Sequence, residues 1–93
     1  MNIYVSIGNS DDKLTQREWA DFITEVSAKV VSLADRIWGE WFSGPQSPYQ
    51  NACWCLLFDS PERAGWARQE AITLRKQFRQ ESIAWATADT EFL

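Results

Sequence analysis

The chain has 93 residues, a formal net charge of −4, two cysteines and no histidine. A chain of this length forms one domain with a modest core, and its acidic balance argues against nonspecific binding to nucleic acid or to anionic membranes. Six Trp, five Phe and two Tyr supply unusual packing area for a small core, which favours a face covered by a partner.

The first half of the chain predicts a strand and then a helix. Residues 2–8 alternate between apolar and other side chains, which indicates a strand with one buried face. A polar loop follows over residues 8–13. Thr15 and Glu18 have the spacing of a capping box, so a helix begins there, and its apolar stripe continues to about Ala34.

The second half predicts two further strands, a helix and a last strand. Residues 37–43 read as a strand in which Gly39 indicates a bulge, and residues 49–59 form the most apolar run of the chain, a buried strand paired with it. A helix begins at Ser60, with Pro61 in its first turn, and ends at about Gln80. Residues 82–87 predict the last strand.

The element order β-α-β-β-α-β predicts a ferredoxin-like α+β fold in a single domain, residues 1–93. We expect a four-stranded antiparallel sheet in the order 4-1-3-2, with both helices on one face. The other face of the sheet is then open. The pattern does not fix which way Trp38, Trp41 and Trp85 face, because their strands are short and mixed.

The open face is the main candidate site. The predicted contact residues for a second copy or a protein partner are Tyr4, Ser6, Cys53, Cys55, Leu57 and Trp66. The two cysteines are two residues apart in one strand and so share a face, where they are poorly placed for a mutual disulfide. We favour small apolar contacts in a dimer interface for them, over a soft-metal or redox site. Trp66 lies off the inner stripe of its helix, which suits either an interface or packing against the C-terminal tail.

Residues 63–80 carry most of the positive charge of the chain. Arg68, Arg75, Lys76 and Arg79 share one flank of the second helix and form a possible anion or ligand patch, although a solvated helix face is the simpler interpretation. Combined with Tyr4, this flank supports a second function, the binding of a small ligand or nucleotide.

Four carboxylates are candidates for a hard cation. The ends of the first and third strands and the start of the fourth are expected to meet, which would gather Asp11, Asp12, Asp59 and Glu81 at one end of the sheet. Ordinary loop solvation and favourable placement at helix N-termini explain the same residues, so we predict no metal and no other cofactor.

Residues 3–9 (Ile-Tyr-Val-Ser-Ile-Gly-Asn) resemble the first-strand motif of the RNA-recognition-motif family, with Tyr4 at its base-stacking position. Residues 52–58 are similar in rhythm to its third-strand motif. The resemblance implies the same topology and the binding of single-stranded nucleic acid, which is a third interpretation. The chain departs from the family where bases are stacked and bound, because Cys53 and Cys55 replace aromatics and Asn51 replaces a basic residue.

Residues 2–15, 50–55 and 82–86 resemble small uncharacterised proteins of actinobacteria and their phages. That resemblance implies an accessory protein that acts on a host factor, and it carries no activity. We expect a non-enzymatic module, since the chain lacks histidine and any nucleophile motif. The free cysteines and the absence of a leader or a long apolar run predict a cytoplasmic protein without a membrane segment.

Overall fold

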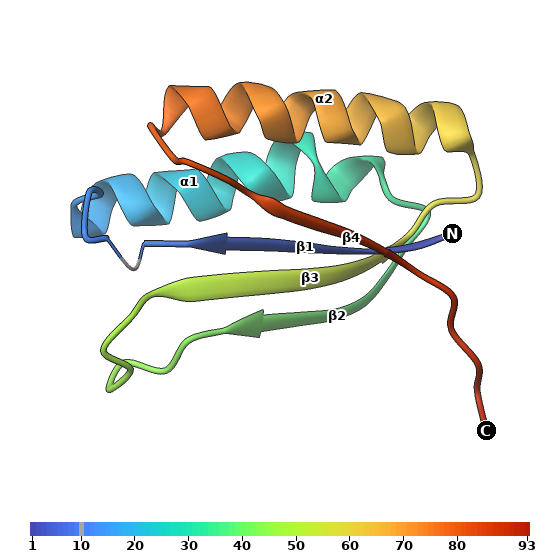
Figure 1. Ribbon diagram of the computed structural model, residues 1–93, viewed down its shortest axis with the longest axis horizontal. Coiled ribbons are helices and arrows are strands. Elements are labelled where there is room, and N and C mark those ends of the chain that lie inside the picture. Colours follow the sequence, from blue (N-terminus) through green and yellow to red (C-terminus); the bar gives the residue numbers. More distant parts are fainter. Residues whose placement is uncertain (10) are drawn as a thin grey trace.

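The computed structural model describes residues 1–9 and 11–93 (Figure 1). Ser10, part of the expected polar loop, lies outside the described residues. The elements follow the predicted order: β1 (Asn2–Gly8), α1 (Gln16–Lys29), η1 (Val31–Leu33), β2 (Arg36–Phe42), β3 (Asn51–Leu57), α2 (Pro61–Gln77) and β4 (Ala84–Ala88).

The four strands form one sheet in the order β2-β3-β1-β4, which is the predicted order read from the other edge. Each neighbouring pair is antiparallel. Both helices lie on the same side of the sheet, above it in Figure 1. The ferredoxin-like α+β arrangement is therefore confirmed.

Local sequence signals explain where the helices begin and end. Thr15 caps α1 by accepting from the backbone N–H of Glu18, whose side chain bonds back to the N–H of Thr15, as a capping box requires. The helix ends at Lys29, earlier than the predicted Ala34. The chain then tightens into the short 3-10 helix η1, in which Val31 is buried.

The second helix also ends earlier than predicted. Ser60 caps α2 and Pro61 occupies its first turn, as expected. The helix stops at Gln77, because Phe78 leaves helical geometry and Arg79 adopts a φ of 58°, a left-handed conformation that cannot continue an α-helix.

The core lies between the sheet and the helices. The alternation of β1 and β3 sends one set of side chains into it, and the inner stripes of α1 and α2 meet that set. The rings of Phe22 and Phe78 stack at a centroid distance of 4.7 Å. The largest fully buried side chains are Trp54, Phe22, Phe58, Ile3, Leu56 and Leu74.

Strand bounds differ from prediction by a few residues. The buried strand is Asn51–Leu57 rather than residues 49–59, and β4 begins at Ala84 rather than Ser82. The bulge expected at Gly39 is present, because the pairing of β2 with β3 shifts between Ile37 and Gly39. Among the described residues, no helix has the length and apolar character needed to span a membrane.

Candidate interaction face of the sheet

The side of the sheet away from the helices carries three rows of side chains. The register of the strands defines them. From β2 through β3 and β1 to β4, the first row is Trp41, Cys53, Ser6 and Ala84; the second is Gly39, Cys55, Tyr4 and Ala86; the third is Arg36, Leu57, Asn2 and Ala88. We call these rows, together with Trp38, the open face.

The five sheet residues predicted for this face are brought together. Tyr4 is the cross-strand partner of Cys55, Ser6 is the partner of Cys53, and Leu57 lies beside Asn2. Directly opposed residues on one side of an antiparallel pair lie close enough for their side chains to touch. The fourth strand adds only alanines, which leave Tyr4 and Ser6 uncovered from that side.

Trp41 lies flat on the face because Gly39 has no side chain. A Cβ placed on Gly39 would stand 2.5 Å from Cη2 and 2.7 Å from Cζ2 of the Trp41 ring. Gly39 is also the cross-strand partner of Cys55, so the ring that lies over Gly39 borders this thiol. With Tyr4 on the other side, this accounts for the burial of Cys55 while Cys53 stays partly exposed.

Trp38 occupies the corner of the face near the C-terminal tail. Its Nε1 donates to Oδ1 of Asn2 at 3.0 Å, and Nδ2 of Asn2 donates to Oγ1 of Thr90 at 2.7 Å. The ring of Phe92 lies 5.9 Å from the ring of Trp38, and the guanidinium of Arg36 lies 5.2 Å from it. The tail therefore reaches this corner and borders the face, with Phe92 itself 80% exposed.

Cys55 affects the pKa of its cross-strand partner Tyr4. Side-chain hydrogen bonding to Cys55, followed by the charge interaction with Cys55 and by desolvation, raises the pKa of the Tyr4 phenol above its ordinary value. The phenol is thus neutral at physiological pH. The centre of the open face consequently carries no formal charge on Tyr4.

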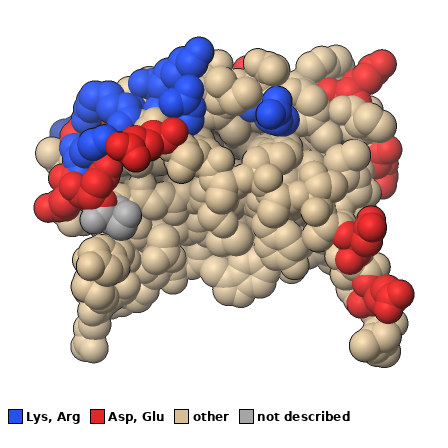
Figure 2. Space-filling view, viewed as in Figure 1, with Lys and Arg blue, Asp and Glu red and all other residues tan. Residues whose placement is uncertain are grey.

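Charge is nearly absent from the open face. Within its three rows Arg36 is the one formally charged residue, and it stands at a corner. Figure 2 shows charged side chains mainly over the helices and at the extremities of the view, with a wide uncharged area below. A nearly uncharged face with exposed aromatic rings is typical of a surface that a partner covers.

Sequence reasoning left the facing of three tryptophans open. Trp41 and Trp38 lie on the open face, whereas Trp85 pairs with Val5 and packs against the core. The sequence did contain a signal for the facing of Trp41, because a bulge at Gly39 changes the alternation of the strand and sets Gly39 and Trp41 on one side.

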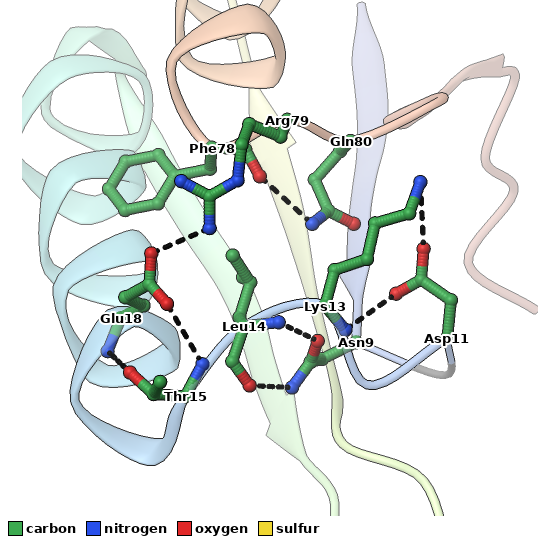
Figure 3. Close-up of polar contacts among 9 residues, drawn as sticks. All are labelled: Asn9, Asp11, Lys13, Leu14, Thr15, Glu18, Phe78, Arg79 and Gln80. Carbon is green, nitrogen blue, oxygen red and sulfur yellow. Dashed lines mark hydrogen bonds and ion pairs between the residues drawn. The ribbon is translucent and has the colours of Figure 1, made fainter.

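The structural role of Asn9 was not predicted from the sequence. Asn9 is buried and holds the loop between β1 and α1 (Figure 3). Its Oδ1 accepts from the N–H of Leu14 at 3.0 Å, and its Nδ2 donates to the carbonyl of Leu14 at 3.0 Å and to Oε1 of Gln50 at 2.8 Å. These bonds satisfy a buried side chain whose unpaired atoms would otherwise be costly. Asn9 positions the loop and has no donor left for a ligand on its amide.

Trp66 does not belong to the open face. It lies on α2, in the helical layer, and 61% of its side chain is exposed. The alternative of packing against the tail is not seen, since Phe92 contacts Trp38 on the other side of the sheet. Trp66 is therefore separated from the other predicted contact residues.

The predicted gathering of four carboxylates is wrong. Because β1 and β3 are antiparallel, the end of β1 and the end of β3 lie at opposite ends of the sheet. Asp11 and Glu81 do lie near one another, joined by Lys13 at 3.4 Å and 3.9 Å, and Asp12 belongs to the same loop, whereas Asp59 follows the far end of β3. No cluster of three or more metal-binding side chains occurs among residues 1–9 and 11–93.

The basic flank of α2 is divided between different contacts. The guanidinium of Arg79 binds Oε2 of Glu18 at 2.7 Å and lowers the pKa of that carboxyl, mainly through this hydrogen bond (Figure 3). Arg75 donates to the carbonyl of Gln80 at 3.3 Å. Arg68 and Arg75 line a separate groove, while Lys76 is exposed.

Comparison with protein-family models, with curated proteins and with solved structures gave no match to this chain.

Proposed function

We propose that this protein is a non-enzymatic binding module that works through protein–protein contact, and that two copies join through the open face. The observation that carries the proposal is a sheet face that has no helical cover and one charged residue, Arg36, at its corner. Its aromatic side chains are substantially exposed: 37% for Tyr4, 43% for Trp38 and 54% for Trp41. Burying such rings is a main source of binding free energy in interfaces.

The size of the face sets the expected affinity. Four strands about 4.8 Å apart and three rows about 6.8 Å apart give a flat area of roughly 20 Å by 20 Å. That is small beside the roughly 800 Å² of accessible surface that each partner buries in a standard interface. We therefore expect a dimer with a micromolar dissociation constant rather than an obligate one.

The charge distribution favours a second copy as the occupant. A net charge of −4 makes two copies repel at long range, but the acidic side chains lie outside the three rows of the open face. Two copies that meet face to face keep those carboxylates apart. A two-fold contact also sets each Trp41 against a surface of the same composition, as an isologous interface requires.

The accessibility of Cys53 tests the proposal. In a Cys55→Ala variant, Cys53 is the one remaining thiol, and it is partly exposed in the monomer. We expect its reaction with an aromatic disulfide reagent to slow as protein concentration rises from about 5 µM to about 500 µM, because association removes the thiol from solvent.

A thiol on the helical layer is the matched control. Gln69 is exposed on α2, so a Gln69→Cys chain that also carries Cys53→Ala and Cys55→Ala places one thiol away from the open face. Its reaction rate should not depend on concentration. Equal concentration dependence at both positions, or none at Cys53, would contradict the open face as the contact.

A further inference from the structure

A groove lies between the second half of α2 and the start of β4. It has a volume of about 260 Å³ and is lined by Arg68, Ala71, Ile72, Arg75, Glu81, Ser82, Ile83 and Trp85. Trp85 of β4 and Ile83, which precedes the strand, pack against the core, on the side of the sheet opposite to Ala84 and Ala86 of the open face. The groove is therefore a second surface, and nothing in the dimer proposal uses it.

Two guanidinium groups stand at this groove. Arg68 makes no ion pair with any carboxylate of the residues that the structure describes, and Arg75 has a carbonyl contact at 3.3 Å with Gln80. Figure 2 shows basic side chains gathered over this part of α2. Guanidinium groups bind carboxylates through paired N–H donors, and a site with two of them favours an anion.

The rest of the groove is largely apolar. Ile72 and Ile83 are partly buried, Ala71 is buried, and Trp85 packs against the core with part of its ring accessible. Convergent charged groups beside an apolar floor are the usual composition of a small-molecule site. An ion without an apolar body would leave this floor uncovered.

We propose that the groove binds a small organic anion with an apolar body, such as an aromatic carboxylate, with its carboxylate on Arg68 and Arg75 and its body on Ile72, Ile83 and Trp85. The volume of about 260 Å³ lies just below the range of about 300–1,000 Å³ typical of drug-sized ligands. The ligand is accordingly smaller than a nucleotide.

Glu81 provides a second, opposite test of the same groove. Its carboxylate stands at the rim of the groove, its side chain is highly exposed, and it forms an ion pair with Lys13 at 3.9 Å. A negative charge at the rim opposes an anionic ligand. Removing that charge should strengthen binding, an effect that a general loss of structure would not produce.

The test follows methyl and indole signals in two-dimensional NMR during a titration with 3-phenylpropionate. We expect saturable shifts at Ile72, Ile83 and Trp85. The neutral 3-phenylpropanamide and the small anion acetate should bind at least about tenfold more weakly, because each lacks one half of the recognition. Equal binding of the amide, shifts centred on Tyr4 and Cys53, or no saturable shift with 3-phenylpropionate would overturn the proposal.

Single substitutions assign the site. Arg68→Gln changes an exposed side chain and should weaken 3-phenylpropionate binding about tenfold. Arg75→Gln should weaken it similarly, although this change also removes the contact with Gln80. Glu81→Gln should tighten binding. Lys76→Gln, an exposed basic position outside the groove, is the matched control and should leave the affinity unchanged.

An unchanged affinity for Arg68→Gln, in a variant whose spectrum remains that of the folded protein, refutes the site. The same conclusion follows if Lys76→Gln and Arg68→Gln weaken binding equally, because the anion would then respond to the overall charge of the helix and not to the groove.

Discussion

Substitution of Gly39 by alanine tests how the open face is built. The new Cβ would stand 2.5 Å from Cη2 of Trp41, whereas ordinary carbon contacts are about 3.5–4.0 Å. The ring must therefore move by about 1 Å or more. Because the clash involves the far end of an exposed side chain on an edge strand, the ring can swing off the sheet while the backbone stays in place.

The expected change in stability is small. No glycine among the described residues has a positive φ, so the backbone conformation of Gly39 is one that alanine can adopt. Alanine also restricts the unfolded chain, which stabilises by about 0.4–1 kcal/mol and offsets part of the lost contact between Trp41 and the sheet. We expect the free energy of unfolding to change by less than about 1 kcal/mol.

The larger effect should be on Cys55. Trp41 borders this thiol, and Cys55 is only 5% exposed in the wild-type structure. In a Cys53→Ala background, Gly39→Ala should increase the reaction rate of Cys55 with an aromatic disulfide reagent by about tenfold, because reactivity of a structural thiol follows access. Denaturant titration of the same variants measures stability.

A double-mutant cycle isolates the cause. In a chain that carries Trp41→Ala, the further change Gly39→Ala should leave the rate at Cys55 unaltered, because the ring is already gone. A loss of more than about 3 kcal/mol on Gly39→Ala would show that the ring cannot swing off the sheet. An unchanged rate at Cys55 would show that Trp41 does not cover this thiol.

Three other outcomes follow from the contacts described. Asn9→Ala should lower the free energy of unfolding by about 2–3 kcal/mol in denaturant titration, because it leaves buried backbone groups of Leu14 unpaired; a loss below about 0.5 kcal/mol would contradict this. The pKa of Glu18 is lowered by Arg79, so this pair stabilises the fold above the ordinary value of 4.5 and its contribution is lost as pH falls through the lower folded value. The stability difference between wild type and Arg79→Gln should thus shrink on acidification, and a growing difference would refute the pairing. Raising salt should increase the dimer fraction, because it screens the repulsion between acidic chains; a decrease would point to an ionic interface.

The fold could be predicted from the sequence because its signals are local and agree with one another. Alternation in residues 2–8, the capping box at Thr15 and the Ser60-Pro61 start of α2 each fix an element, and their order leaves one common topology. Tyr4, Cys53 and Cys55 were placed on the open face by the same alternation. Helix ends were less accurate, since they depend on tertiary packing around Val31 and Phe78.

The rest of the site depends on contacts between distant segments. Trp38 is fixed by Asn2 and by the tail, neither of which its own strand can indicate. The basic flank was predicted as one patch, but Arg79 is drawn to Glu18 in another helix. The predicted carboxylate cluster required the ends of β1 and β3 to meet. These strands are antiparallel, so Asp11 and Asp59 lie at opposite ends of the sheet.

Sedimentation velocity on wild type, Cys53→Asp and Gln69→Asp tests the central proposal most directly. Both substitutions add one negative charge, the first on the open face and the second on the exposed side of α2. We predict a dimer for wild type and Gln69→Asp at about 100 µM and a monomer for Cys53→Asp, because an interface cannot bury an unpaired carboxylate at low cost. A monomeric wild type at that concentration, or a dimer that Cys53→Asp leaves intact, would contradict association through the open face.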